Sequence, residues 1–334
     1  VDAEALEMGV SYLRICCVIS FGIIFFSLFE KLLQATGRSL YSTIGQVVGA
    51  VVNIILDPIM IYGIGPVPEM GVKGAALATI ISQAVSCGWV LAFLTGKKTF
   101  LRIKKEYLKP VPSIVFPCLA LGLSTFVMQS SESVISVCFN SSLLKYGGDL
   151  AVGAMTILTS TMQFAMLPLQ GIGQGAQPIM SYNYGARNID RMKKTFKLHL
   201  VISLIYSTLF WLFVQLFPAT FAGIFSSDPE LVSFTAGALR IYCGAMFLFG
   251  IQLACQMTFV SIGNAPCSIV VAVLRKFVLL LPLIYLLPHL LADQTRAVFL
   301  AEPVADTIAV TGTVILFTLQ FRKALRRLES ENKS

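Results

Sequence analysis

The stretch YSTIGQVVGAVVNIILDPIMIYGI, residues 41–64, is long and apolar enough to cross a membrane as one helix, yet it contains Asn53 and Asp57. An ionisable side chain in such a segment costs about 2.5–3.5 kcal/mol on insertion scales, so it usually lines a water-filled path or has a partner. The i, i+4 spacing places the amide and the carboxylate on one helix face. Pro58 cannot donate to the carbonyl oxygen of Ile54, so that oxygen is free to act as a ligand. The carboxylate, the amide oxygen and this carbonyl oxygen together suit a proton or a hard cation such as Na⁺.

The composition of the whole chain is that of a multi-pass membrane protein. Only 13% of its 334 residues are charged, and its mean hydropathy is +0.80, well outside the range of soluble domains. About 20 apolar residues cross a bilayer as a helix. The sequence therefore predicts an all-α bundle with nine such segments, near residues 10–33, 41–64, 72–95, 112–139, 150–180, 195–217, 233–259, 266–290 and 297–320.

The net charge of +8 indicates membrane topology rather than nucleic-acid binding. Of the 25 lysines and arginines, 18 lie in alternate loops on one face, and five lie on the other. Cytoplasmic loops carry such an excess of basic residues. We therefore expect residues 97–111 and the tail 322–334 to be cytoplasmic, and the chain to lie in the cytoplasmic (inner or plasma) membrane.

Two parts of the sequence repeat one another. The matches are Leu13-Arg14-Ile15 with Leu239-Arg240-Ile241 and Gly37 with Gly263, for a shift of 226 residues, and Ala75-Ala76-Leu77 with Ala297-Val298-Phe299, for a shift of 222. Corresponding segments run in the same direction, which predicts a parallel repeat about an axis along the membrane normal. The second copy has six predicted segments and the first has three.

This difference predicts that the chain is nine helices of a twelve-helix protein, with about three helices missing before Val1. We expect residues 1–96 to form the second half of an amino-terminal lobe and 97–111 to form a linker. A six-helix carboxy-terminal lobe would follow over 112–321, and a tail over 322–334.

Three polar side chains on two consecutive segments are predicted to share one depth in the outer leaflet. With a rise of 1.5 Å per residue, Asp57 and Thr79 each lie about 10 Å from the external end of their segment, and Asn53 about 16 Å. We interpret Asn53, Asp57 and Thr79 as a cation-coupling site. Separate hydrogen bonds between helices are the alternative.

A second polar group is predicted to line a cavity in the carboxy-terminal lobe. Glu132 lies about 10 Å deep, and the glutamines of the next segment fall within about 60° of one another on a helical projection. The cavity candidates are Glu132, Gln129, Gln163, Gln170, Gln174 and Gln177. Structural hydrogen bonding, with Glu132 as a neutral acid among serines, is the alternative.

Four further charged residues lie in predicted membrane segments. Glu302 and Asp306 form another i, i+4 pair, but they start only five residues inside their segment. They are weaker site candidates, and an interfacial structural role is an equal alternative. Arg275 and Lys276 are expected to extend toward the cytoplasmic interface.

The sequence contains no pattern typical of an enzyme. His199 and His289 are predicted at opposite membrane faces, and HExxH, GxSxG and P-loop motifs do not occur. The eight cysteines lie in apolar segments without ligand spacing, as packed thiols do. We expect no cofactor, and no metal beyond Na⁺ at Asp57, Asn53 and Thr79. The expected partners of a monomeric protein are small molecules, a coupling cation and the bilayer, without nucleic acid.

Five stretches resemble the MATE (multidrug and toxic compound extrusion) family, in particular its DinF-like branch. They are LLQATGRS (32–39), NIILDPIMIYG (53–63), GVKGAALATIISQ (71–83), GQGAQPIMSYNYGA (173–186) and LAEPVADTIA (300–309). The resemblance implies a V-shaped pair of six-helix lobes that exports amphipathic, often cationic, compounds in exchange for Na⁺ or H⁺. Asn53, Asp57 and Thr79 match the family's amino-lobe site, whose further aspartate would precede Val1.

The resemblance to the NorM-like branch of the family is incomplete. That branch has a glutamate eight residues after a Gly-Leu-Pro, and here Glu132 follows Gly122-Leu123-Ser124 at that distance. Its tenth-helix aspartate is not matched, because the equivalent stretch reads Gly250-Ile251-Gln252. We therefore expect a cation-coupled antiporter whose coupling site lies in the amino-terminal lobe. A flippase for lipid-linked oligosaccharides and a non-transporting membrane scaffold are the alternatives.

Overall fold

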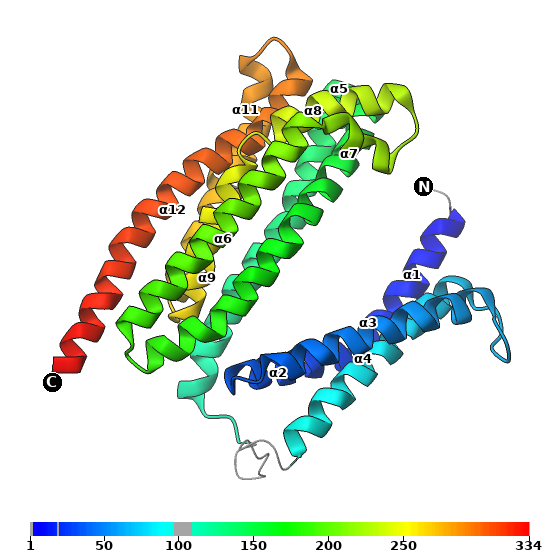
Figure 1. Ribbon diagram of the computed structural model, residues 1–334. Coiled ribbons are helices and arrows are strands. Elements are labelled where there is room, and N and C mark those ends of the chain that lie inside the picture. Colours follow the sequence, from blue (N-terminus) through cyan, green and yellow to red (C-terminus); the bar gives the residue numbers. More distant parts are fainter. Residues whose placement is uncertain (1–2, 19, 97–108, 334) are drawn as a thin grey trace. The chain divides into compact units, whose positions relative to one another are not determined.

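The computed structural model describes residues 3–18, 20–96 and 109–333, and within these ranges the chain is helical without a strand. It divides into two compact units, Val1–Pro110 and Val111–Ser334 (Figure 1). The predicted all-α class is confirmed.

Unit 1 is built around a pair of antiparallel helices. Its helices are α1 (Ala3–Val18), α2 (Phe21–Ala35), α3 (Ser39–Tyr62) and α4 (Gly71–Thr95). Glycines let α3 and α4 approach closely: a Cβ atom on Gly74 would overlap the carbonyl oxygen of Met60, and one on Gly49 would overlap the hydroxyl of Ser86. Gly63 ends α3 with a left-handed φ of +68°. These contacts fix the register of the two helices.

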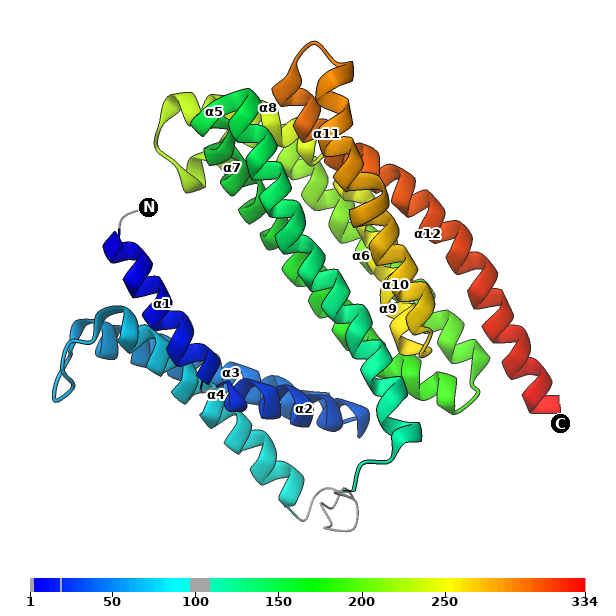
Figure 2. The same cartoon turned by 180° about the vertical axis from the view of Figure 1, so that it is seen from behind.

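Unit 2 contains the remaining elements. They are α5 (Pro112–Gly185), α6 (Ile189–Leu216), α7 (Pro218–Phe225), α8 (Pro229–Tyr242), η2 (Met246–Leu248), α9 (Phe249–Ser261), α10 (Ala265–Val273), the π-helical η3 (Leu274–Leu280), α11 (Leu281–Leu290) and α12 (Gln294–Lys333). The chain turns back within α5 at Gly148, whose φ of +65° is non-helical (Figure 2). The two limbs of α5 supply the predicted segments 112–139 and 150–180.

Six helices in the described residues are long and apolar enough to cross a membrane, or up to eight if each of two bent helix pairs counts as one span. The sequence predicts nine. The count differs because one of the six, Gln129–Gly185, includes parts of both limbs of α5. The chain is a multi-pass membrane protein.

The two bent pairs lie at equivalent places in the repeat. In unit 1, Glu7–Val18 and Phe21–Ala35 are bent by 49°, and in unit 2, Pro229–Tyr242 and Met246–Ser261 are bent by 47°. The shift of 226 residues places Phe21, the first residue of α2, on Phe247 of η2, so the two breaks lie close to one another in the predicted repeat. The bends agree with this repeat, which stays a prediction.

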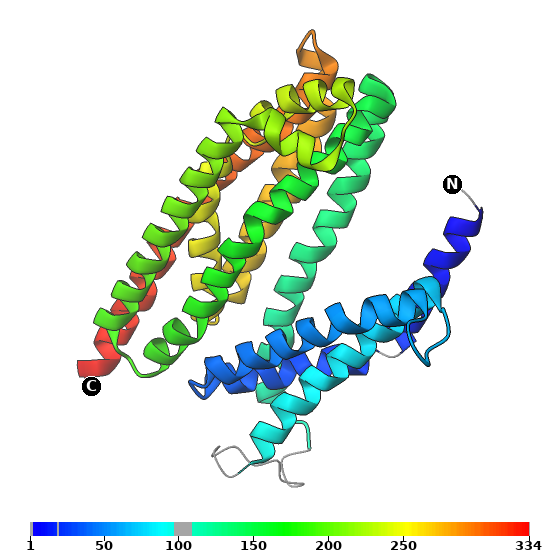
Figure 3. The ribbon, with the colours of Figure 1, turned by 45° about the vertical axis from the view of Figure 1, so that its right-hand side comes forward.

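One face of α6 stabilises the break in unit 2. Ser207 Oγ donates to the carbonyl oxygen of Phe247 (2.9 Å), Trp211 Nε1 to that of Gly244 (3.1 Å), and Gln215 Nε2 to that of Arg240 (3.1 Å). The donors are spaced i, i+4, i+8, so they form one row along α6. Figure 3 shows the helix α6 beside the second limb of α5. Backbone groups in a membrane need such partners because no water is available there. This row of bonds ties the end of α8 and the break before α9 to α6.

Candidate functional site

Five charged side chains from three elements of unit 2 form one ion-pair network. Arg275 of η3 donates through Nε to Asp306 Oδ1 (2.6 Å) and through Nη2 to Glu302 Oε1 (3.1 Å), both on α12. Lys276 Nζ lies 3.0 Å from Glu132 Oε1 on α5 and 3.8 Å from Glu302 Oε1. The network thus joins helices that are far apart in the sequence.

Local structure explains why these side chains meet. Glu302 and Asp306 are one turn apart on α12 and face the same direction. Arg275 and Lys276 are consecutive, and they lie in the π-helical η3, a type of turn that is frequent at functional sites. The guanidinium carbon of Arg275 also lies 5.1 Å from the ring centre of Phe249, which adds a cation–π contact.

One sequence prediction is wrong at this network. Lys276 is only 6% exposed and Arg275 is paired with two acids, so neither side chain extends away from the protein toward the interface. Glu302 and Asp306 are 3% and 2% exposed, and both are paired with Arg275. The physical reason is shared: a buried charge is tolerated where an opposite charge bonds to it, and here each group supplies the other's partner.

The network has three acids and two bases, and some of its acceptors are unsatisfied. Glu302 Oε2 is buried and has no hydrogen-bond partner, and the same is true of Oε1 of Gln252 on α9. Both atoms are acceptors. The site therefore has one more acid than bases, and two acceptor atoms that could take further donors.

A small cavity of about 90 Å³ opens beside the network. Its polar lining consists of Gln129, Glu132, Gln170, Gln252, Gln256, Arg275 and Lys276, with Phe249 and Leu253 among the apolar residues. Glu132 is the exposed acid of the network, with 55% of its side chain accessible. The cavity combines an apolar wall with a carboxylate and several amides.

The structure brings only part of the predicted cavity set to this place. Gln129, Glu132 and Gln170 line the cavity, whereas Gln163, Gln174 and Gln177 do not. The glutamines share a stripe on α5, but Gln163 and Gln177 are 14 residues apart, or about 21 Å along a helix. That length exceeds the cavity, so the stripe cannot all lie in it.

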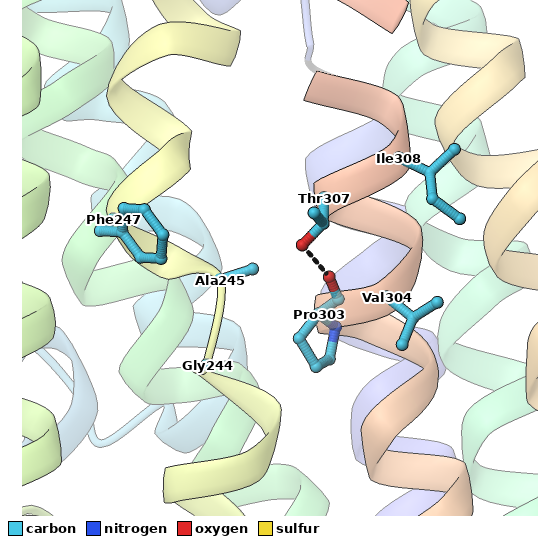
Figure 4. Close-up of a pocket in the computed structure, with 7 residues that line it drawn as sticks. All are labelled: Gly244, Ala245, Phe247, Pro303, Val304, Thr307 and Ile308. Carbon is cyan, nitrogen blue, oxygen red and sulfur yellow. Dashed lines mark hydrogen bonds between the residues drawn. The ribbon is translucent and has the colours of Figure 1, made fainter. Parts of the chain in front are cut away.

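A larger cavity of about 400 Å³ lies between α12 and the break before η2, and it carries no charge (Figure 4). Its lining is Gly244, Ala245, Phe247, Pro303, Val304, Thr307 and Ile308. The hydroxyl of Thr307 already donates to the carbonyl oxygen of Pro303 (2.7 Å). Without a titratable group, this cavity offers no ion site.

The candidate cluster of unit 1 lies on α3 and α4. Asn53 Nδ2 donates to Asp57 Oδ1 over 3.1 Å, and both side chains are half-buried. The close approaches at Gly74 and Gly49 place Thr79 at the level of the turn between Asn53 and Asp57. The Thr79 hydroxyl donates to the carbonyl oxygen of Ala75 (3.0 Å), and no hydrogen bond among the described residues joins it to the pair.

A buried acid in unit 1 was not predicted from the sequence. Glu30 on α2 is 7% exposed, and its Oε1 accepts from Gln34 (2.9 Å), Ser42 (3.3 Å) and Gln46 (2.7 Å). These amides and a hydroxyl satisfy the carboxylate without an ion pair in the described residues. An acid within the predicted segment 10–33 was the signal that could have indicated it.

Comparisons with known proteins identify the fold. Residues 124–286 match the MatE family model. Among solved structures, a MATE protein in the bent conformation superposes with a TM-score of 0.89 at 23% identity, over 98% of this chain and 72% of that one. The chain has the MATE fold. A MOP-superfamily transporter from Pyrococcus furiosus Vc1 also superposes, with a TM-score of 0.89 at 23% identity, over 97% of this chain and 72% of the other.

Curated relatives have names that fit this fold. The multidrug export protein MepA of Staphylococcus haemolyticus is 26% identical over 96% of this chain and 69% of its own length. MepA of Staphylococcus saprophyticus is 24% identical over 98% of this chain and 70% of its own length. The family resemblance that the sequence motifs indicated is confirmed.

Sequence reasoning missed how the charges of unit 2 are paired. Glu132 was predicted to line a cavity or to hydrogen-bond among serines, but it bonds to Lys276. The presence of Arg275 and Lys276 inside an apolar segment was the available signal, because such residues usually have partners. Gln252, in the stretch where the family's aspartate was not matched, lines the cavity with an unsatisfied oxygen atom.

Proposed function

We propose that the chain belongs to an efflux transporter that exports amphipathic or cationic small molecules in exchange for H⁺ or Na⁺. The MATE fold and relatives named as multidrug export proteins support this function. The observation that carries the coupling mechanism is the 3.1 Å bond between Asn53 and Asp57 in a membrane-crossing helix.

In the proposed mechanism, Asp57 binds the coupling ion. The carboxylate and the amide oxygen of Asn53 supply ligands, and the carbonyl oxygen of Ile54, freed by Pro58, supplies another. Thr79 lies at the same level of α4 and would join them after its hydroxyl rotates. Ion binding must favour one conformation over the other, because an ion with equal affinity for both cannot drive exchange.

Unit 1 and unit 2 would correspond to the amino- and carboxy-terminal lobes. We propose that the loop 97–111 and the tail 322–334 face the cytoplasm, and that the protein works as a monomer in the cytoplasmic membrane. The carboxy-lobe cavity would contribute to substrate binding through Glu132, Gln129 and Gln170.

A flippase for lipid-linked sugars is less well supported. Such a protein needs free positive charge to bind pyrophosphate. Arg275 and Lys276 are both paired with carboxylates, so the described part of the carboxy lobe supplies none at the cavity.

The function is tested by drug tolerance. The protein, expressed from its complete gene in a bacterial strain without its own efflux pumps, should raise tolerance to at least one cationic dye or antibiotic. Unchanged tolerance across a broad panel, with the protein present in the membrane, would contradict multidrug export.

A further inference from the structure

Lys276 lies within reach of two carboxylates, and this arrangement goes beyond a static ion pair. Its Nζ is 3.0 Å from Glu132 Oε1 and 3.8 Å from Glu302 Oε1. The other oxygen of Glu302 is buried without a hydrogen-bond partner. A shift of the ammonium group by about 1 Å would bring it into hydrogen-bond distance of Glu302. The flexible four-carbon stem of lysine permits such a shift without moving the backbone.

The two acids differ in their exposure. The Glu132 side chain is 55% accessible, whereas those of Lys276 and Glu302 are 7% and 4% accessible. A ligand can therefore approach Glu132 from the cavity, but not Glu302. If a ligand cation formed an ion pair with Glu132, the ammonium of Lys276 could remain paired by moving to Glu302.

The charge balance favours this exchange. Three acids share two bases, so the network has room for one more positive charge. With the ligand cation on Glu132, Lys276 on Glu302 and Arg275 on Asp306, each buried charge would have an opposite partner. Pairing of this kind is what makes charge in a low-dielectric interior tolerable.

The lining indicates which cation fits. A cavity of about 90 Å³ has the volume of about three water molecules, which is enough for an ammonium head group but not for a whole drug. Gln252 Oε1 also needs a donor. A protonated amine has N–H groups for both Glu132 and Gln252, whereas a quaternary ammonium has none.

We propose that the ammonium of Lys276 is paired with Glu132 while the cavity is empty. It moves to Glu302 when the protonated amine of a substrate binds Glu132. This inference rests on the proposed function and deepens it. Lys276 is then the residue that sets specificity: it competes with the substrate, and amines that displace it are favoured over quaternary ammonium compounds of the same size.

The test is equilibrium binding to the purified protein in lipid nanodiscs, without an ion gradient. The probes are dansylcadaverine, a fluorescent primary amine, and its trimethylammonium derivative. We expect the amine to bind at least about tenfold more tightly, from the lost hydrogen bonds of the derivative. Equal affinity for the two probes would overturn the assignment of the head group.

Two substitutions act in opposite directions. Lys276→Met removes the competitor and should tighten amine binding about tenfold, and Glu132→Gln should weaken it by a similar factor. In a Glu132→Gln background, Lys276→Met should have no effect, because the two residues act through one contact. Lys194→Met, an exposed lysine of α6, is the matched control and should leave both affinities unchanged.

Glu302→Gln tests the proposed movement of Lys276 even if the Lys276→Met protein does not fold. Glu302 does not line the cavity, but its charge is the place to which Lys276 must move. Glu302→Gln should therefore keep Lys276 on Glu132 and weaken amine binding about tenfold, while leaving two acids and two bases in balance. Wild-type affinity in folded Glu302→Gln protein would overturn the proposal.

The outcomes separate this inference from the proposed function. Drug export together with unaltered binding in Glu302→Gln would reject the Lys276 exchange alone. The expected binding pattern without export by the intact protein would support the exchange and reject efflux.

Discussion

Arg275 Nε donates to Asp306 Oδ1 over 2.6 Å, so a charged side chain of the protein itself is paired with an acid of unit 2. In the candidate cluster of unit 1 the donor to Asp57 is a neutral amide, that of Asn53, whereas in unit 2 the donor is a guanidinium paired with two acids. The acids of unit 2 thus already hold a covalently attached cation. We infer that the mobile coupling ion binds in unit 1.

Asp57→Asn should abolish gradient-driven efflux while substrate binding and folding survive. The substitution keeps the size and hydrogen bonding of the side chain but removes its charge, so the ion no longer distinguishes the two conformations. Efflux of a fluorescent cationic dye from energised vesicles is the measurement. Asp190→Asn, an exposed acid in the first turn of α6, is the control and should transport normally.

Glu132→Gln is informative beside Asp57→Asn, because it should reduce efflux less. Its effect is expected on substrate affinity and not on coupling. Normal efflux in Asp57→Asn together with abolished efflux in Glu132→Gln would move the coupling site to the carboxy-terminal lobe.

Arg275→Met should destabilise the protein by about 3–5 kcal/mol, because it leaves Glu302 and Asp306 buried without their main partner. Thermal unfolding in detergent is the measurement. Arg296→Met is the control: its ion pair with Asp293 is mostly exposed, with 75% and 54% of the two side chains accessible, and such pairs contribute about 0–1 kcal/mol. Equal losses in the two variants would show that the buried network does not stabilise the fold.

Gly74→Ala should weaken the packing of α3 against α4 by about 1–3 kcal/mol, because the new Cβ would overlap the Met60 backbone. Gly88→Ala, on the same helix, meets no atom within 4 Å and is the matched control. Cross-linking between cysteines placed on α3 and α4 should fall in the first variant and persist in the second.

The carboxyl-terminal tail should be cytoplasmic, as the excess of lysine and arginine in alternate loops predicts. A fluorescent protein fused after Ser334 should be bright, and alkaline phosphatase fused there should be inactive. The opposite pair of signals would invert the orientation of every loop.

The sequence alone was sufficient for features that depend on neighbouring residues. It gave the membrane segments, because hydropathy is local, and the bond between Asn53 and Asp57, because i, i+4 spacing in a helix brings two side chains together. The family motifs added the fold. The turn inside α5 also follows from a local cause, since Gly148 has a φ of +65°, which other residues rarely adopt.

Only the tertiary structure decided where the charges of unit 2 lie and how they are paired. Glu132, Lys276 and Glu302 are separated by 144 and 26 positions, and their contact depends on how α5, η3 and α12 pack. Sequence reasoning directed Lys276 toward the cytoplasmic interface, where an unpaired charge is least costly, and left Glu302 open between a site role and an interfacial role. Packing of the helices places an opposite charge beside each of them, so both are tolerated in the interior. No local sequence pattern indicates such a long-range partner.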